Sequence, residues 1–427
     1  MSEKKIRIAF IGCGRFAKHF VPLFKAHPEV EKVFVCDLIP ERAQKYSEVF
    51  EVPIIESFEE AMKSEEINAV AIFTQRFSHG PLVIEALKNG KHVYSAVPCS
   101  ISIDEIKEIA RLVDETGLTY SMGETGYYRT AAIFCREKFA SGEMGKFTYG
   151  EAQYNHDIRN MEGSFKSSGG DDWKKFAGIP PFFYPTHSTA MILSCMPGVY
   201  AKKVCGFGYK SVNNTDIYGT EGQNFYNNPF GNETLVAELS NGGVMRISEN
   251  RNIGWKCPET FITQFNGTDG CYSFAVAKHF FGHWNPECNN KVIMKDVSDM
   301  LLPEVVTTAL EKDYEDGIQQ VADGVGFFDM SPIQDASRLP ESFRNLNNGH
   351  NGTHHFIVDD FCKAVATGKL SPTNIWEVAR YSMPGLIAHE SAMQGGILMD
   401  VPDLGNPPEK FEMLDPYDFE YNQGNTK

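Results

Sequence analysis

Apolar and polar positions along the first 125 residues predict strands that alternate with helices. Short apolar runs, typical of strands buried on both faces, are separated by stretches whose apolar residues recur at helical spacing. The predicted strands are Ile6–Ile11, Val33–Val35, Ile54–Ile55, Ala69–Phe73, His92–Tyr94 and Thr119–Met122. The predicted helices are Phe16–Ala26, Glu41–Phe50, Ser57–Met62, Pro81–Lys88 and Ile103–Thr116. This order predicts a doubly wound parallel sheet with helices on both faces.

The pattern changes after about Glu124. A helix is predicted over Ala131–Ser141, and period-two alternation then dominates, with hairpin signals such as Asn241-Gly242-Gly243. The predicted strands are Phe147–Tyr154, Val204–Tyr209, Thr234–Leu239, Gly243–Ser248 and Phe261–Asn266. We therefore expect an α/β fold of two domains, 1–125 and 126–427, the second built on a large, mostly antiparallel open sheet. Residues 275–345 are rich in Asn, Pro, His and Asp and predict an irregular excursion around the site or between subunits.

Composition excludes several classes of protein. The 427 residues carry a formal net charge of −16, which argues against nucleic acid and anionic membranes as partners. The sequence has neither the apolar run of about 18 residues that a membrane span needs nor a signal peptide, so we expect a cytoplasmic protein. None of the ten cysteines forms a C-x-x-C pair, which disfavours a zinc ribbon or a thioredoxin-type site.

A glycine-rich turn follows the first predicted strand. Its residues, Gly12-Cys13-Gly14-Arg15-Phe16-Ala17, read G-x-G-x-x-A and lead into a predicted helix. In a dinucleotide-binding turn, the first glycine permits the tight bend, the second lets the backbone approach the pyrophosphate, and the helix N-terminus stabilises the anion. Asp37 ends the second strand, where a carboxylate accepts hydrogen bonds from a ribose 2′-hydroxyl and repels a 2′-phosphate. The motif predicts a Rossmann domain that binds NAD rather than NADP; the alternative is a glycine turn that binds nothing.

With three further segments, this turn resembles the Gfo/Idh/MocA family of sugar oxidoreductases. The segments are Thr74-Gln75…His79, Gly90-Lys91-His92-Val93-Tyr94 and Gly267-Thr268-Asp269-Gly270. The resemblance spans about residues 5–405 and implies a Rossmann domain plus an α/β domain whose open sheet faces the nicotinamide and favours a homo-oligomer. The predicted cofactor-binding residues are Gly12, Gly14, Arg15, Phe16, Asp37, Thr74, Gln75, His79, Ala96 and Pro98.

One position departs from the family pattern. Most members carry Glu-Lys-Pro after the fifth strand, and the lysine assists proton transfer from the sugar hydroxyl. This chain has Ala96-Val97-Pro98, and the side chain of Val97 can neither exchange a proton nor carry charge. Either the protein is not a standard dehydrogenase, or another residue moves the proton.

A narrower resemblance accounts for the missing lysine. The NAD-dependent α-N-acetylgalactosaminidases, a branch of this superfamily, also lack it. The matching patterns are Glu124 with Tyr128-Arg129, Tyr154–Arg159, Tyr184-Pro185-Thr186-His187, Gly349-His350-Asn351-Gly352 with His354-His355-Phe356, and Tyr381–Ser391. Enzymes that oxidise glycosides at C3 look similar at this level, and the sequence does not separate the two groups.

The chemistry of alcohol oxidation suggests roles for these residues. Removing a hydride from a secondary alcohol requires a base for the hydroxyl proton, and a neutral histidine suits that task near pH 7. We predict His187 as the base, with Tyr184 on the same face if the segment opens a helix, and His156 as a second catalytic residue. The predicted substrate-binding residues are Glu124, Tyr128, Arg129, Tyr154, Asp157 and Arg159.

Several of these residues also have purely structural interpretations. A buried His or Tyr is often a satisfied polar core residue, and Asp157 and Arg159 can simply pair with each other. His354 and His355 are not predicted to bind a metal, because adjacent residues on a helix point apart. We therefore expect no metal site.

Three functions remain open from the sequence. The first is an NAD-dependent oxidoreductase that oxidises the C3 hydroxyl of a small-molecule glycoside. The second is a redox-neutral NAD-dependent glycosidase, in which the C3 ketone acidifies the C2 proton and the group on C1 then leaves by β-elimination; Glu124, Tyr154 and His156 are its candidate bases. The third is a sugar or NAD sensor that lost catalysis with the lysine.

Overall fold

The computed structural model describes residues 5–253, 260–275, 278–285, 291–302, 318–319, 330–343 and 346–417. The described residues fold into two compact units. Unit 1 is drawn from Met1–Tyr128, Pro303–Glu377 and Asn406–Lys427, and unit 2 from Arg129–Leu302 and Val378–Gly405. The predicted domain limits are continuous along the chain, whereas unit 1 also takes in residues from the C-terminal part.

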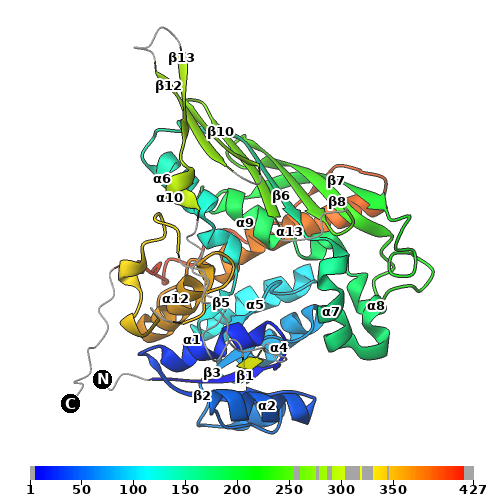
Figure 1. Cartoon of the computed structure of the whole chain (residues 1–427), viewed down its shortest axis with the longest axis vertical. Helices are drawn as coiled ribbons and strands as arrows, with labels where there is room; N and C mark the ends of the chain where they lie inside the picture. Colours follow the sequence, from blue (N-terminus) through cyan, green and yellow to red (C-terminus); the bar gives the residue numbers. More distant parts are fainter. Residues whose placement is uncertain are drawn as a thin grey trace, which may run out of the picture. The chain divides into compact units, whose positions relative to one another are not determined.

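Unit 1 contains a five-stranded parallel sheet, which confirms the predicted doubly wound fold (Figure 1). Its strands, in the order β2-β1-β3-β4-β5, are β1 (Ile6–Ile11), β2 (Val30–Cys36), β3 (Ala69–Ile72), β4 (His92–Ser95) and β5 (Tyr120–Met122). The predicted strand at Ile54–Ile55 is reduced to one bridge between Ile54 and Val35. Reversal of the strand order between β2-β1 and β3 places the ends of β1 and β3 where doubly wound proteins bind ligands.

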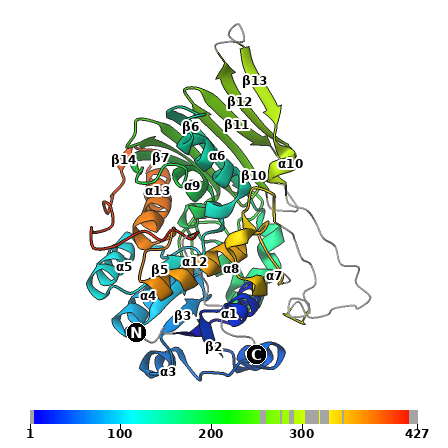
Figure 2. The ribbon, with the colours of Figure 1, turned by 90° about the vertical axis from the view of Figure 1, so that its left-hand side faces the viewer.

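Unit 1 contains helices beside this sheet, and four of the five predicted helices lie close to their predicted ranges. The helices of unit 1 are η1 (Ala17–His19), α1 (Val21–Ala26), α2 (Pro40–Phe50), α3 (Phe58–Lys63), η2 (Arg76–Ser78), α4 (His79–Lys88), α5 (Ile103–Thr116), η3 (Thr125–Tyr128), η7 (Ala336–Arg338), η8 (Glu341–Phe343) and α12 (Thr353–Thr367). The single helix predicted over Phe16–Ala26 is wrong, because the segment divides into η1 and α1 around Phe20. Pro22 lacks an N–H and is disfavoured in a helix interior, and α1 begins just before it. Figures 1 and 2 both place α12 beside α1, where Phe361 packs against Phe24.

Unit 2 contains a nine-stranded sheet that is antiparallel except for one pair, β6 with β9, which confirms the mostly antiparallel prediction. Its strands, in the order β13-β12-β11-β10-β6-β9-β8-β7-β14, are β6 (Phe147–Asn155), β7 (Ala201–Lys210), β8 (Phe230–Leu239), β9 (Val244–Asn250), β10 (Thr260–Gly267), β11 (Gly270–Ala275), β12 (His279–Asn285), β13 (Lys291–Asp296) and β14 (Met399–Asp400). Strands β12 and β13 lie within the segment predicted to be irregular. Most of the remaining residues of 275–345, for which the irregular excursion was predicted, lie outside the described ranges.

Helices pack closely on one face of this sheet (Figure 1). Unit 2 has helices α6 (Thr130–Ala140), α7 (Ile158–Gly169), η4 (Gly170–Asp172), α8 (Trp173–Ala177), η5 (Pro181–Phe183), α9 (Thr186–Leu193), α10 (Ser298–Leu301) and most of α13 (Ile375–Met393). Glycine permits two close approaches: a Cβ at Gly206 of β7 would lie 2.1 Å from the Ala388 carbonyl oxygen of α13, and one at Gly150 of β6 would lie 2.8 Å from Ile192 of α9. The C-terminal end of α9 therefore lies close against β6.

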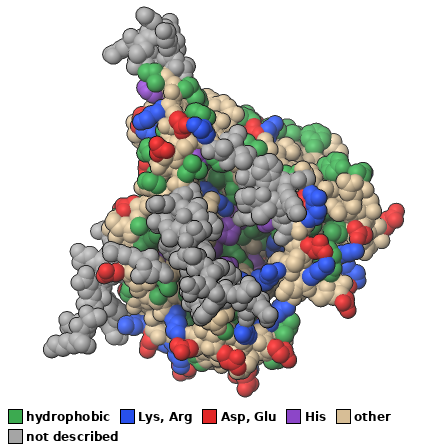
Figure 3. Space-filling view, in the orientation of Figure 1, with side chains coloured by type: hydrophobic (Ala, Val, Ile, Leu, Met, Phe, Trp, Pro, Cys, Tyr) green, Lys and Arg blue, Asp and Glu red, His purple; other side chains and the backbone are tan. Residues whose placement is uncertain are grey.

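The described surface fits the acidic composition. On the face drawn in Figure 3, basic side chains lie among acidic ones rather than in a continuous patch over the described residues. No helix in the described ranges is long and apolar enough to span a bilayer.

Candidate active site

The glycine turn of unit 1 fits a dinucleotide. Gly12 has φ +100° and donates its N–H to the Cys36 carbonyl oxygen, and a Cβ there would lie 2.7 Å from the Phe73 carbonyl oxygen. A Cβ at Gly14 would meet no atom within 4 Å. Packing and conformation therefore require glycine at the first position, whereas the second leaves an open approach to the backbone, as a pyrophosphate needs.

Asp37 is tied into this turn. One carboxylate oxygen accepts the N–H of Cys13 at 2.7 Å, and the other accepts the N–H of Ile39 at 2.8 Å. Leu38, between them, is fully exposed, and Ile39 is 41% exposed. Sequence analysis missed these apolar side chains, which offer a contact surface for a base beside the carboxylate predicted to bind the ribose.

The remaining predicted cofactor residues of unit 1 lie at or near the carboxyl ends of β1, β3 and β4. Arg15 is exposed and Phe16 is half-buried, while Gln75 precedes η2 and Ala96 follows β4.

His79 is buried, and its two ring nitrogens contact two different loops. Its Nδ1 lies 2.7 Å from the Pro98 carbonyl oxygen and its Nε2 lies 3.1 Å from that of Thr74. Burial lowers the pKa of His79. A neutral imidazole has one N–H and therefore donates to one of these two carbonyl oxygens at a time. His79 thus links the two loops, and its contact with the cofactor stays a prediction.

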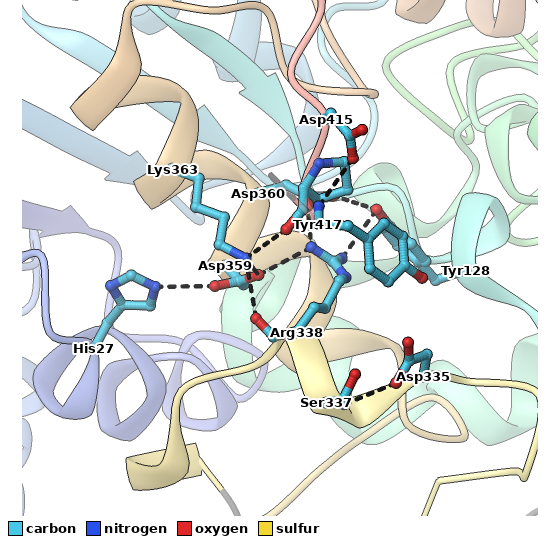
Figure 4. Close-up of polar contacts among 11 residues, drawn as sticks. His27, Tyr128, Asp335, Ser337, Arg338, Asp359, Asp360, Lys363, Asp415 and Tyr417 are labelled. Carbon is cyan, nitrogen blue, oxygen red and sulfur yellow. Dashed lines mark hydrogen bonds and ion pairs between the residues drawn. The ribbon is translucent and has the colours of Figure 1, made fainter. Parts of the chain in front are cut away.

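Two predicted substrate residues of unit 1 have local structural partners. Glu124 is fully buried, and its Oε1 accepts the N–H of Gly126 at 2.6 Å, which closes the turn into η3. The hydroxyl of Tyr128 donates to Asp360, while Arg338 Nη2 donates to that hydroxyl at 3.1 Å (Figure 4). Substrate contact by Glu124 and Tyr128 stays a prediction, and their buried partners favour a positioning role.

Tyr128 belongs to a buried ionic cluster on α12. Asp359 accepts from Arg338 and Lys363, each at 2.9 Å, and lies 3.3 Å from His27 Nε2 (Figure 4). Burial alone would raise the pKa of Asp359, but the surrounding His27, Arg338 and Lys363 lower it below its usual value. Burial raises the pKa of the neighbouring Asp360. Opposite charges from α12 and η7 are therefore paired inside unit 1.

In unit 2, the structure joins the two residues predicted as the main catalytic pair. The Tyr184 hydroxyl lies 2.7 Å from His187 Nε2, and the two rings meet edge to face. Pro181–Phe183 forms η5, and Pro185 caps α9, so both residues come from one short loop-to-helix segment. His187 is 2% exposed, whereas Tyr184 is half-exposed. The tyrosine is therefore the member of the pair that a ligand reaches first.

A second tyrosine–histidine pair lies at the end of β6. The Tyr154 hydroxyl is 2.7 Å from His156 Nδ1, and the Tyr154 ring stacks on Phe261 of β10 at 4.6 Å. The edge of the His187 ring meets the Tyr154 ring at 5.4 Å. The structure thus brings the predicted residues of two separate sequence motifs into one continuous group.

Arg251 and Glu249, which sequence analysis missed, lie behind this group. The guanidinium carbon of Arg251 is 4.9 Å from the Tyr154 ring centroid and 5.8 Å from that of Tyr184. Its Nη2 donates to fully buried Glu249 at 3.0 Å, and Ser188 of α9 donates to the same carboxylate at 2.6 Å. No local motif marks Arg251, because only the folded sheet places it beneath both tyrosine rings.

Three predicted substrate residues of unit 2 have defined contacts. Asp157 caps α7 and accepts hydrogen bonds from the Arg159 side chain at 2.7 and 3.1 Å and from the Ile253 N–H. Burial would raise the pKa of Asp157, but these hydrogen bonds lower it. The guanidinium of Arg129 covers the Phe261 ring at 4.6 Å. Asp157 and Arg159 therefore pair with each other, as the structural alternative predicted. Their contact with substrate stays a prediction.

Adjacent histidines on α12 face different partners. His354 hydrogen-bonds His350, and His355 accepts from Asn348 at 3.1 Å. Within the described ranges, no three His, Cys, Asp or Glu side chains are grouped so as to hold a metal ion.

Comparison with known proteins identifies the first domain. Residues 6–124 match the model of the Gfo/Idh/MocA oxidoreductase family, described as an NAD-binding Rossmann fold. A glycosyl hydrolase family 109 protein of Solibacter usitatus is 26% identical over 205 residues, covering 45% of this chain and 46% of the relative. The chain therefore spans about half the length of that relative.

Two further matches extend over most of the chain. A glycosyl hydrolase family 109 protein of Bacteroides thetaiotaomicron is 26% identical over 419 residues, covering 93% of this chain and 84% of the relative. A solved levoglucosan dehydrogenase in complex with NADH has a TM-score of 0.68 and 16% identity, covering 94% of this chain and all of that one. This structural likeness concerns the fold. The family match, the glycine turn and Asp37 together show that residues 6–124 are an NAD-binding Rossmann domain of the Gfo/Idh/MocA oxidoreductase family.

Proposed function

We propose that the protein is an NAD-dependent oxidoreductase that oxidises a sugar hydroxyl, at C3 of a glycoside, to a ketone. The observation that carries this proposal is the 2.7 Å hydrogen bond between Tyr184 and His187. The pair would supply a proton acceptor. This chain needs one because it has Val97 at the position where most members of the family that it resembles carry lysine. The names of the relatives, glycosyl hydrolases and a sugar dehydrogenase, support a sugar substrate.

The preference for NAD over NADP is part of the proposal. Asp37 holds a carboxylate at the glycine turn, where it would accept hydrogen bonds from a ribose 2′-hydroxyl and repel a 2′-phosphate. Gly12, Gly14 and the N-terminus of η1 would hold the pyrophosphate, and Leu38 would contact the adenine. When bound, NAD supplies the acceptor for the hydride that leaves the sugar carbon.

The proton of the sugar hydroxyl would leave through the Tyr184–His187 pair. Half-exposed Tyr184 accepts that proton as its own passes to Nε2 of buried His187, so the tyrosine ends neutral and the histidine protonated. The Arg251 guanidinium, beside the Tyr184 ring, stabilises negative charge that develops on the phenol oxygen during this transfer.

A redox-neutral glycosidase is the second candidate, favoured by the second pair at Tyr154 and His156. After oxidation at C3, this pair would take the acidified C2 proton, and the C1 substituent would leave with the electrons of its bond. Water would add back across the resulting double bond, and return of the hydride to C3 would complete hydrolysis without net redox change. Dehydrogenation needs one base, so a second tyrosine–histidine pair is the feature that this longer reaction explains. A non-catalytic sensor would need neither pair.

Self-association is also proposed. Large apolar side chains are exposed on adjacent strands of the unit 2 sheet: Phe207 (61%) and Tyr209 (45%) on β7, and Val236 (43%) on β8. A second copy of the chain would cover them. Light scattering should give the mass of a homo-oligomer, and a mass of one chain at micromolar concentration would refute this.

The function is tested with purified protein, excess NAD and a panel of chromogenic and plant-type glycosides, while NADH and free aglycone are followed together. Accumulating NADH with a keto-glycoside and no aglycone supports the dehydrogenase. Aglycone release without net NADH supports the glycosidase. Neither signal, in a protein that binds NAD, would favour the sensor.

A further inference from the structure

We propose that His350 binds the dinucleotide, so that the cofactor site has a second wall formed by the chain segment that precedes α12. The inference rests on the proposed use of NAD and assigns a new residue to that site. It concerns residues of unit 1 alone.

His350 lies against the phosphate-binding turn. Its ring meets Phe16 edge to face, with the centroids 5.6 Å apart. Phe16 is the fifth residue of the G-x-G-x-x-A motif and directly precedes η1. The imidazole of His350 is half-buried, so part of it stays accessible beside the turn. The open side of Gly14, two residues before Phe16, belongs to the same short segment.

A buried partner holds His350 in this place. His350 Nδ1 lies 2.7 Å from His354 Nε2, and the His354 ring packs on Phe16 at 5.7 Å and on Phe20 at 4.5 Å. His354 is 1% exposed. A hydrogen bond between two ring nitrogens needs a proton on one and a lone pair on the other, so it couples the tautomers of both rings. His354 is thus a positioning residue for His350.

The backbone turns His350 toward the glycine turn. His350, Asn351 and Gly352 have φ of 50°, 57° and 89°, three successive left-handed residues immediately before α12. Two of them are not glycine, and such residues adopt this conformation only where their surroundings hold it. At Gly349, a Cβ would lie 2.3 Å from the His354 ring, so glycine is needed for the segment to close on that ring. The ring that contacts Phe16 thus belongs to the first of these three left-handed residues.

Packing of α12 connects this turn to the Rossmann core. Phe361 of α12 contacts Phe24 of α1 at 5.9 Å and Tyr94 of β4 at 5.7 Å. The helix is thereby anchored on the sheet that carries the dinucleotide motif. Its N-terminal turn consequently lies at the carboxyl end of β1, where doubly wound sheets bind ligands.

The chemistry of imidazole suits the ligand. A ring N–H is a hydrogen-bond donor, and a dinucleotide presents phosphate and ribose oxygens as acceptors. The chain has a net charge of −16, which repels an anionic ligand. A histidine beside the pyrophosphate offers a hydrogen-bond donor and adds no negative charge.

The test is calorimetric titration with NAD alone, without sugar, on the full chain. We expect His350→Ala to raise the Kd for NAD about tenfold, the effect of losing one hydrogen bond to a charged group. His350→Phe keeps a ring against Phe16 but lacks nitrogen, and it should weaken binding to a similar extent. Asn351→Gly is the matched control, because glycine adopts the local φ of 57° readily, and it should bind NAD within about twofold of wild type.

Outcomes separate this inference from the proposed function. Wild-type NAD affinity in folded His350→Ala, or in His350→Phe if the alanine variant fails to fold, would overturn the role of His350 and leave the function standing. Equal loss of affinity in Asn351→Gly would also overturn it, since the segment rather than the imidazole would then matter. Absence of NAD binding by the wild-type chain would overturn the proposed function itself.

Discussion

The hydroxyl of Tyr184 lies 2.7 Å from Nε2 of His187, and only the tyrosine is appreciably exposed. In the proposed reaction the two side chains would have different tasks, because the exposed phenol would meet the sugar and the buried imidazole would take the proton. Replacing Tyr184 with Phe or His187 with Ala should reduce turnover about 10²–10⁴-fold, the usual contribution of general acid–base catalysis. Steady-state kinetics measures this, and NAD affinity measured on the same preparations should stay unchanged. Turnover above one tenth of wild type in both variants would exclude the pair as the proton acceptor.

Arg251 should matter for rate more than for substrate affinity. Arg251→Met keeps much of the side-chain length but removes the cation beside the Tyr154 and Tyr184 rings. We expect kcat to fall with a smaller change in KM, because the charge stabilises a transient phenolate. The change also removes the ion pair of Arg251 with buried Glu249, so melting temperature is measured in parallel. Arg251→Lys should restore part of kcat; a kcat as low as in Arg251→Met would indicate that packing, not charge, is what matters.

Two glycines provide a matched test of the cofactor turn. Gly14→Ala adds a methyl group where no protein atom lies within 4 Å, so it should weaken NAD binding at least tenfold with little change in melting temperature. Gly206→Ala forces a methyl group to 2.1 Å from the Ala388 carbonyl oxygen and should destabilise the fold by about 1–3 kcal/mol. Calorimetric titration and thermal melting measure the two effects. Unchanged NAD affinity in Gly14→Ala would contradict the assigned role of the open side.

Asp37 should decide between the two nicotinamide cofactors. Asp37→Ser removes the carboxylate charge and retains a short polar side chain that can still accept the Cys13 N–H. We expect the preference for NAD over NADP to fall at least tenfold, because repulsion of the 2′-phosphate is lost. The Kd values of both cofactors are measured on wild type and variant. Equal affinities in the wild-type protein would already refute the assignment.

Buried histidine should make the fold sensitive to mild acid. Burial lowers the pKa of His355 to about 3, whereas an unfolded histidine titrates near 6.5. Between these values the unfolded chain binds the extra proton, so stability contributed by neutral His355 is present above pH 6.5 and is lost as pH falls toward 3. Between pH 7 and 5 this amounts to about 2 kcal/mol. His355→Gln should therefore lose less stability over that interval than wild type in denaturant titrations; parallel losses would show that His355 does not carry the effect.

Local patterns predicted much of unit 1. The strands, most helices, the glycine turn and Asp37 were all readable, because each depends on residues close together in the chain. The division of the first predicted helix at Phe20 was missed, although Pro22 was a visible signal. Strands β12 and β13 were missed since polar residues in their segment obscured the alternation.

By itself, the sequence determined the Rossmann domain and its nicotinamide dinucleotide, since both follow from a short motif. It also predicted the tyrosine and histidine residues of the proposed site from short motifs. Tertiary structure decided which of them meet. Pairing of β6 with β10 places Tyr154 opposite Phe261, and the fold brings Arg251 beneath Tyr154 and Tyr184 and His350 against Phe16. Such contacts depend on strand register and helix packing. Both are set by burial between residues far apart in the sequence, so no local pattern predicts these contacts.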